Sequence, residues 1–179
     1  MNRRTKTQIA KGSRKKGSGY ELKIAKLFTA WWGYPVYRTP ASGGTHWEGD
    51  LICKEKPLPF CVECKKRESW SFEGLFRELS SLWGFWSQCK RDAQKSGKAG
   101  LLVFSKNRRP DYFMVRTRLI GELVEWVGDF MGVKIYALPF QSNQERWVTI
   151  GLLDDFLDWL DPEGAKACFK DIEKISQLS

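Results

Sequence analysis

Apolar residues recur at helical spacing near the start of the chain and then give way to short, strand-like runs. Four of them follow one another at intervals of three or four positions: Leu22, Ala25, Phe28 and Trp32. This spacing predicts a helix over residues 18–32. Short apolar runs then predict strands over 35–38, 50–54 and 60–65. A loop rich in Gly, Ser and Thr joins the first two strands.

A second helical stripe occupies the middle of the chain. Its six members are spaced 4-3-4-3-4: Leu75, Leu79, Leu82, Trp86, Cys89 and Ala93. They predict one long helix over residues 71–96. Phe76, Trp83 and Phe85 lie off this stripe, so the helix is apolar on more than one side. That pattern indicates either burial within the chain or contact with a second copy, in which Phe76 and Trp83 would form the interface.

Helices and strands are mixed through the rest of the sequence. The remaining apolar runs predict strands over 101–105, 111–116, 133–138 and 147–150, and helices over 119–130, 152–160 and 162–175. This arrangement predicts an α/β fold with a mixed sheet. Gly12 and Gly17 interrupt the basic N-terminus, so we expect a flexible arm over residues 1–17, followed by a single domain over 18–179.

Length and composition restrict the class of protein. A chain of 179 residues is suited to one domain, and no charge-free run exceeds 11 residues, which is too short to span a bilayer. No apolar segment follows the basic N-terminus, so the sequence predicts no secretory signal. We therefore expect a cytoplasmic protein with no membrane partner.

Charge is distributed unevenly along the chain, which has a formal net charge of +9. Residues 1–16 contain no acid and seven basic residues: Arg3, Arg4, Lys6, Lys11, Arg14, Lys15 and Lys16. Residues 61–118 carry a net charge of +7, whereas residues 119–179 carry −6. This asymmetry favours a surface that binds a polyanion such as nucleic acid, with the arm contacting phosphates. The alternative is a solubilising tail with solvated helix faces.

Five cysteines are present, and their number and spacing argue against structural roles for disulfides or zinc. An odd count without a secretory signal predicts reduced thiols. Cys61 and Cys64 are spaced like zinc ligands, but no second Cys/His pair with the spacing of a zinc finger follows. They also lie three apart on a predicted strand, so their sulfur atoms should point to opposite faces.

The same strand carries a carboxylate and an amine that can act together. Glu63 and Lys65 are two residues apart, so they share one face with Cys61, while Phe60, Val62 and Cys64 face the core. A charged pair in a buried strand is costly unless it is satisfied or binds a ligand. Asp50 begins the preceding strand, and if the two strands form a hairpin, Asp50 and Glu63 converge. Two carboxylates supply hard oxygen ligands suited to Mg²⁺.

Four motifs, taken in order, carry a resemblance to a known family. They are Gly17-Ser18-Gly19-Tyr20-Glu21-Leu22, Val36-Tyr37-Arg38-Thr39-Pro40-Ala41-Ser42-Gly43, Gly49-Asp50-Leu51-Ile52 and Val62-Glu63-Cys64-Lys65. The sequence resembles archaeal-type Holliday-junction resolvases of the PD-(D/E)xK nuclease superfamily. The resemblance covers residues 17–116 and implies a restriction-endonuclease-like mixed β-sheet flanked by helices. Residues 119–179 would then add C-terminal α/β elements.

The resemblance implies a metal-dependent site. Asp50 and Glu63 would bind Mg²⁺, for which Mn²⁺ could substitute, with the Cys64 carbonyl as a backbone ligand and Glu21 as a further candidate. Lys65 would act on the attacking water or on the developing charge. The implied catalytic set is Glu21, Ser42, Asp50, Glu63 and Lys65, and no small-molecule cofactor is implied. One departure is Gly49, which stands where the name of the signature has proline.

DNA contacts also follow from the resemblance. Arg38 and Ser42 would hold the region of the scissile phosphate, and Lys66 would add a further contact. Acting on four-way DNA junctions, in recombination or repair, the protein would cut two opposed strands as a homodimer with paired, symmetric nicks.

Each of these residues also has an ordinary structural interpretation. Ser18 and Glu21 match a capping box at the start of the predicted helix. Lys65 could begin a solvated basic run, and Asp50 and the Ser42-Gly43-Gly44 stretch could serve turns. His46 and Glu48 are suited to an ordinary loop.

Two rival functions remain open at this point. One is another nuclease of the same superfamily that nicks or repairs DNA, and the other is a DNA-binding module without catalysis. The presence of Asp50, Glu63 and Lys65 together argues against the second rival, because DNA binding alone gains nothing from acids that repel phosphate.

Overall fold

The structure is a computed structural model that describes residues 6–40, 49–76, 80–128, 135–139 and 147–166. Within these ranges the side chains of residues 6–16, 76, 126 and 135–139 lie outside the description. No helix in the described part of the chain is long and apolar enough to cross a membrane.

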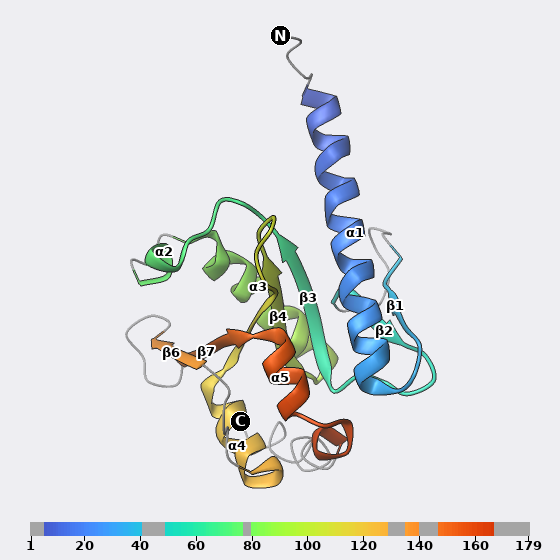
Figure 1. Ribbon diagram of the computed structural model, residues 1–179, viewed down its shortest axis with the longest axis vertical. Coiled ribbons are helices and arrows are strands. Elements are labelled where there is room, and N and C mark those ends of the chain that lie inside the picture. The colour runs from blue at the N-terminus through green and yellow to red at the C-terminus, as the bar shows by residue number, and fades with distance from the viewer. Residues whose placement is uncertain (1–5, 41–48, 77–79, 129–134, 140–146, 167–179) are drawn as a thin grey trace.

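A five-stranded mixed sheet forms the centre of the molecule (Figure 1), in the order β3-β4-β5-β7-β6. Its strands are β3 (Phe60–Lys66), β4 (Ala99–Ser105), β5 (Tyr112–Arg116), β6 (Ile135–Pro139) and β7 (Trp147–Leu152). β3 and β4 run parallel, while the other neighbours are antiparallel. β3 therefore lies at an edge of the sheet, with only β4 beside it in the ladder.

One face of this sheet is covered by three helices. They are α1 (Lys6–Trp32), α4 (Thr117–Val127) and α5 (Leu153–Trp159). Alternation along the strands turns Val62 and Val103 toward this face, where they share one buried core with Phe28 of α1 and Phe156 of α5. Their burial anchors β3 against α1.

The opposite face is covered by α2 (Phe72–Phe76) and α3 (Ser81–Ser96). Leu102 and Phe104 of β4 meet Leu82 and Trp86 of α3 in a second buried core. Helices on both faces of a mixed sheet confirm the predicted α/β fold class.

Helix α1 begins twelve residues earlier than expected, at Lys6 instead of Ser18. The prediction of a flexible arm is therefore wrong for residues 6–17, and residues 1–5 lie outside the described chain. Lys, Arg, Gln and Ala are good helix formers, and each interior glycine costs only about 1 kcal/mol, so a helix fixed by packing at its far end can extend through them. The N-terminal half of α1 projects beyond the end of the sheet (Figure 1).

The single long helix expected over residues 71–96 is also wrong. It is divided into α2 and α3, because Ser80 has the extended backbone of an N-cap (φ −76°, ψ 135°) and its hydroxyl accepts a hydrogen bond from the Leu82 N–H at 3.3 Å. The helical spacing persisted across this break because Leu75 and Leu82 enter the same core from two helices.

The other predicted elements are confirmed with shifted ends. The first two strands are β1 (Val36–Arg38) and β2 (Leu51–Cys53), and they form a separate two-stranded sheet. The last predicted helix is present over residues 162–166, and the rest of it lies outside the described chain.

Trp83 belongs to the core of its own chain. It is 7% exposed, and its indole Nε1 donates a hydrogen bond to the Leu75 carbonyl at 3.2 Å. The interpretation of Trp83 as a dimer contact is therefore wrong, and the side chain of Phe76 lies outside the description. The apolar face of α3 is explained by packing within one chain.

We predict that Trp83→Glu unfolds the protein instead of separating two copies. The change empties an aromatic site, leaves the Leu75 carbonyl without its donor and buries a carboxylate, which together should cost at least about 3–5 kcal/mol. Chemical unfolding followed by circular dichroism measures this loss. Trp147→Glu is the control, because Trp147 is 40% exposed and should tolerate the change. A stable, folded W83E protein would contradict the assignment.

Candidate active site

Asp50 is docked onto the free edge of β3. Its backbone N–H donates to the Val62 carbonyl at 2.7 Å, and its Oδ2 accepts a hydrogen bond from the Cys64 N–H at 2.7 Å. The N–H and C=O of one strand residue point to the same side, so Val62 and Cys64 both direct their backbone groups away from β4. The predicted hairpin between the strands of Asp50 and Glu63 is wrong, because β2 pairs with β1. The predicted approach of Asp50 to Glu63 is nevertheless present.

Gly49 makes this docking possible. It has φ +84°, and a Cβ built on it would lie 2.9 Å from the Val62 carbonyl oxygen and 3.0 Å from Cys61 Sγ. Proline, fixed near φ −65°, could not adopt this backbone. This chain enters β2 with a positive φ at residue 49, which explains why glycine stands where the signature has proline.

Glu63 and Lys65 form an ion pair on one face of β3, as their spacing predicts. Pairing with Leu102 and Phe104 of β4 places them on the side covered by α3. Glu63 is only 3% exposed. The Lys65 ammonium lies 5.5 Å from the centre of the Phe85 ring of α3, which helps to fix its direction.

Burial and mutual repulsion control the charges of this group. Burial, followed by the negative charge of Asp50, raises the pKa of Glu63 to about 7, against the opposing effect of Lys65. Burial also raises the pKa of Asp50, although the Cys64 N–H, Lys65 and Arg38 act in the opposite direction. Burial alone would lower the pKa of Lys65, but the attraction of Glu63 and Asp50 prevails and raises it. Lys65 is therefore a stable cation between two acids.

Glu21 reaches the same region from the middle of α1. Because α1 extends through Ser18, the capping-box interpretation of Ser18 and Glu21 is wrong. Glu21 Oε2 lies 2.5 Å from Arg38 Nε of β1. Burial and then the charge of Asp50 raise the pKa of Glu21, while Arg38 and Lys65 lower it. Arg38, expected beside the scissile phosphate, is thus paired with an acid of the site.

The other predicted site residues are distributed as follows. Ser42, His46 and Glu48 lie outside the described residues, as do Arg3, Arg4 and the side chains of the basic residues 6, 11 and 14–16. Lys66 lies on the α1 side, with its ammonium 5.6 Å from the centre of the Tyr20 ring.

Asp92 of α3 is a site neighbour that the sequence did not indicate. Its negative charge contributes to raising the pKa values of both Asp50 and Glu63. Phe85 and Asp92 are seven residues apart, so α3 presents both toward the edge of β3. This spacing was visible in the sequence, but nothing local showed which side of α3 faces the acids.

The donor set fits a small, hard cation better than zinc. Cys53, Cys61, Cys64 and Cys89 are free thiols, and no three His, Cys, Asp or Glu side chains among the described residues group as a metal site. Asp50 and Glu63 repel each other in a buried setting, and a divalent cation would relieve that repulsion. The Cys64 carbonyl points to the Asp50 side of β3. Two carboxylates and one carbonyl, completed by water, are typical of Mg²⁺.

Of the comparisons with known proteins, the match to a family model agrees with this chemistry. The model of the family described as "Phage putative PDDEXK endonuclease" matches residues 12–164. A solved structure of Archaeoglobus fulgidus Hjc, a Holliday junction resolvase from an archaeal hyperthermophile, is 14% identical with a TM-score of 0.38. That similarity covers 83% of this chain and 99% of the other. No curated protein sequence matches the chain.

We predict that Gly49→Ala destabilises the protein by about 1–3 kcal/mol, because alanine is strained at this φ and its methyl group would collide with β3. Gly84→Ala is the matched control. Gly84 lies within α3, and a Cβ there meets nothing within 4 Å. It should stabilise the helix by about 1 kcal/mol. Urea unfolding measures both, and equal effects would contradict the role of Gly49.

We predict that Glu63→Gln changes how the stability of the metal-free protein depends on pH. The Glu63 carboxyl titrates near 4.5 when unfolded and near 7 when folded, so the folded state binds more protons between these values. Its contribution to the free energy of unfolding therefore falls as the pH rises from about 4.5 to 7. Glu63→Gln should remove this fall and gain on the order of 3 kcal/mol relative to wild type at pH 8. Urea unfolding in EDTA provides the measurement, and parallel pH profiles would contradict the prediction.

Proposed function

Because the chain belongs to the PDDEXK endonuclease family and is therefore a nuclease, we propose that it is a Mg²⁺-dependent endodeoxyribonuclease acting on four-way DNA junctions. One observation carries the catalytic part of the proposal. The Asp50 carboxylate is held at the edge of β3 by the Cys64 N–H, beside the buried Glu63–Lys65 pair.

Asp50 and Glu63 would hold the Mg²⁺ ion, with the Cys64 carbonyl as a third ligand from the protein. When bound, Mg²⁺ would neutralise phosphate charge and increase the acidity of water. The Cys64 N–H fixes the direction of the Asp50 carboxylate before any ligand arrives. Such pre-organisation avoids rearrangement during the reaction.

Lys65 would stabilise the negative charge that develops on the phosphate. Its raised pKa keeps the ammonium protonated, so it is suited to donate hydrogen bonds and unsuited to remove a proton from water. Its ion pair with Glu63 and the Phe85 ring restrict its motion.

Glu21 would act on the same site through Arg38. Their ion pair joins α1 to β1 and keeps a cation close to Asp50. Glu21 is thus a positioning residue in this proposal, and its partner Arg38 is a cation that could turn toward a phosphate. Ser42 would complete the phosphate contacts.

Selectivity for junctions is the finer part of the proposal. The order of the four sequence motifs supports it. A junction has two strands to cut, so two sites related by a two-fold axis would be required, and we propose a homodimer that makes paired, symmetric nicks. A nicking or repair nuclease of the same family would carry the same residues and cut once.

We predict that Asp50→Asn abolishes cleavage while DNA binding persists or becomes tighter. Removing a carboxylate removes a metal ligand worth several kcal/mol, which corresponds to a loss of about a hundredfold or more in rate. It cannot weaken Coulomb attraction to phosphate. Labelled four-way junction, duplex and flap DNA, each with Mg²⁺ or EDTA, measure cleavage, and anisotropy measures binding.

Asp92→Asn is the matched control, because it removes a neighbouring acid that this proposal does not place on the metal. Undiminished cleavage by D50N would contradict the metal site. Equal cleavage of junction and duplex, or single nicks only, would replace the junction resolvase with the nicking nuclease.

A further inference from the structure

We propose that the β4–β5 loop, residues 106–110, is a phosphate-binding element that grips the DNA backbone beside the active site. The choice of DNA as partner rests on the proposed function, whereas the cationic surface is a property of the structure alone. The loop has the sequence Lys-Asn-Arg-Arg-Pro, and no family motif identified in the sequence includes it.

The topology of the sheet brings this loop to the end of the catalytic strand. β3 and β4 are parallel, and Lys66 lies opposite Ser105 at their carboxyl ends. The backbone N–H of Arg67 donates to the Ser105 carbonyl at 3.1 Å. The loop therefore begins four residues beyond the position of Glu63, or ~13 Å at the rise of a strand. This distance corresponds to about four base-pair steps of duplex DNA.

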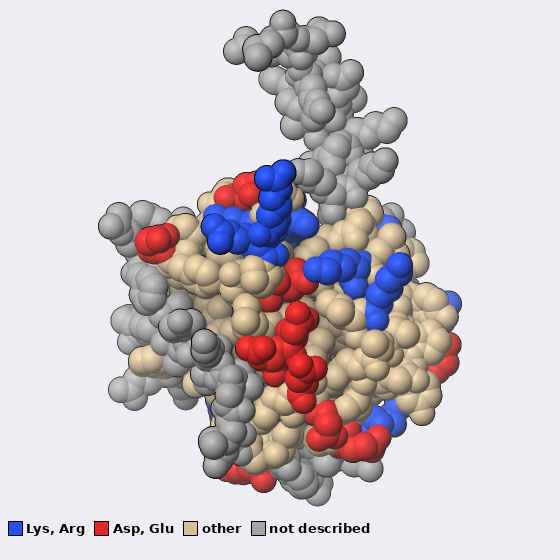
Figure 2. All heavy atoms as spheres, in the orientation of Figure 1, with Lys and Arg blue, Asp and Glu red and all other residues tan. Residues whose placement is uncertain are grey.

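Positive charge concentrates at this end of the sheet. The cationic residues there are Lys66, Arg67, Lys106, Arg108 and Arg109. Figure 2 shows Lys and Arg side chains gathered over this end of the molecule, above a strip of Asp and Glu. Within the described part of the chain, no carboxylate lies within ion-pair distance of Arg108 or Arg109. Cations this close together favour a polyanionic partner, and Arg108 and Arg109 are the two whose charge the loop offers most openly.

Polar contacts make the loop rigid. Ser105 Oγ is buried and lies 3.0, 3.2 and 2.9 Å from the carbonyl oxygens of Lys106, Arg109 and Pro110, so its single hydrogen always finds an acceptor among them. The Asn107 N–H donates to Glu68 Oε1 at 2.9 Å, which commits that carboxylate to the loop backbone. A loop ordered in advance loses little entropy when it binds.

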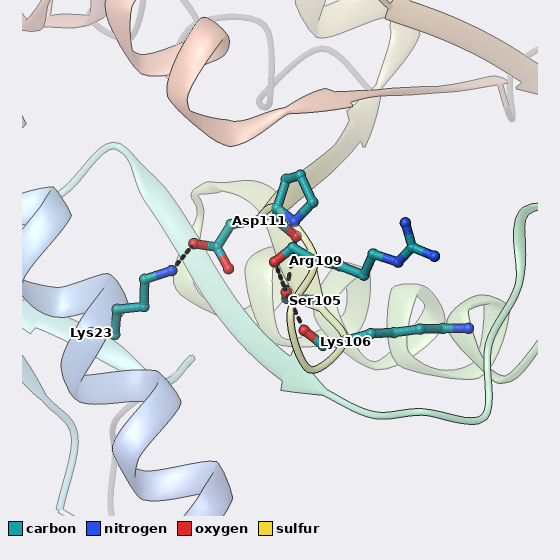
Figure 3. A network of polar contacts seen from close by, with 6 residues as sticks. Lys23, Ser105, Lys106, Arg109 and Asp111 are labelled. Carbon is teal, nitrogen blue, oxygen red and sulfur yellow. Dashed lines mark hydrogen bonds and ion pairs between the residues drawn. The ribbon is translucent and has the colours of Figure 1, made fainter.

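The base of the loop is tied to the rest of the fold. Lys23 of α1 reaches Asp111 Oδ2 at 2.5 Å, and the Asp111 carbonyl accepts a hydrogen bond from the Leu153 N–H of α5 at 2.9 Å. Figure 3 shows the side chains of Lys106 and Arg109 extending together, away from the Lys23–Asp111 pair. Asp111, which anchors the loop, is thus buried and paired with Lys23, while the side chains of Lys106 and Arg109 point away from this pair.

Arg108 adopts a left-handed backbone with φ 57°, which is uncommon for a residue other than glycine. Glycine or asparagine would adopt this conformation with less strain. Arginine at this position therefore carries a conformational cost, and among the described residues its exposed guanidinium forms no ion pair that offsets it. Binding a phosphate would offset this cost.

The test is the salt dependence of DNA binding by the double variant Arg108→Asn/Arg109→Gln. Asparagine suits the left-handed backbone, so the fold should persist. Binding of a fluorescent duplex is titrated by anisotropy in EDTA, where no cleavage interferes, at several KCl concentrations. Loss of two phosphate contacts should reduce the log–log slope of affinity against salt by about 1.8.

Arg116→Gln/Arg118→Gln is the matched control. It removes the same charge at the opposite end of β5, where both residues are exposed. Its slope should stay close to that of wild type. An unchanged slope in the loop variant, or an equal reduction in both variants, would overturn the proposal. Thermal unfolding checks the fold, and Arg109→Gln alone, with an expected reduction of about 0.9, replaces the double variant if that variant unfolds.

Cleavage in Mg²⁺ separates this inference from the proposed function. A protein whose salt slope depends on the loop but which never cuts DNA would keep the loop assignment and lose the proposed activity. A protein that cuts DNA with an unchanged slope in the loop variant would lose the loop assignment alone.

Discussion

The hydrogen bond from the Cys64 N–H to the Asp50 carboxylate joins the two sheets of this molecule at one point. An edge strand such as β3 presents unpaired backbone groups, and Asp50 satisfies two of them, one with its backbone and one with its side chain. The contact requires the close approach that Gly49 allows. It also fixes the spacing of Asp50 and Glu63, so that the charge of Asp50 adds to the larger effect of burial in raising the pKa of Glu63.

Two buried acids lower the stability of the fold, and packing elsewhere in the molecule offsets this loss. One face of β3 packs through Val62 and Cys64 into the core that includes Phe28 of α1, and its other face lies beside α3. The backbone that carries Glu63 and Lys65 is thereby held in place. Backbone strain and charge repulsion between the acids are tolerated at the site because apolar burial elsewhere stabilises the fold by more than they destabilise it.

The parallel pairing of β3 and β4 determines how charge is arranged around the acids. Parallel neighbours end at the same side of a sheet, so the strand that carries Glu63 and Lys65 finishes beside the start of a basic loop. Ligands of α/β sheets commonly bind outside the carboxyl ends of strands. Here the acids lie within the sheet and the cations at its end. The cations at the end of the sheet can therefore bind a polyanion, and the acids within the sheet then lie beside it.

Features that depend on short-range periodicity could be predicted from the amino-acid sequence. Alternation along β3 placed Glu63 and Lys65 on one face and Val62 and Cys64 on the other, because the side-chain period of a strand is local. Helical spacing likewise identified the buried stripe of α3. The motif order pointed to the nuclease family. The two periodic features involve residues only a few positions apart, and the motifs are each short stretches of consecutive residues.

Features that depend on segments far apart in the chain became visible only in the folded molecule. Asp50 approaches Glu63 by hydrogen bonding to the edge of β3. It does not do so through a hairpin, because β2 pairs with β1. Glu21 pairs with Arg38 and caps nothing, since α1 continues to Lys6. Its sequence position allowed Trp83 to contact a partner or to pack in the core. In the structure it lies in the core, where its indole donates a hydrogen bond to the Leu75 carbonyl of α2. Local patterns specify which face of an element is apolar, but only the packing of all elements together determines what covers that face.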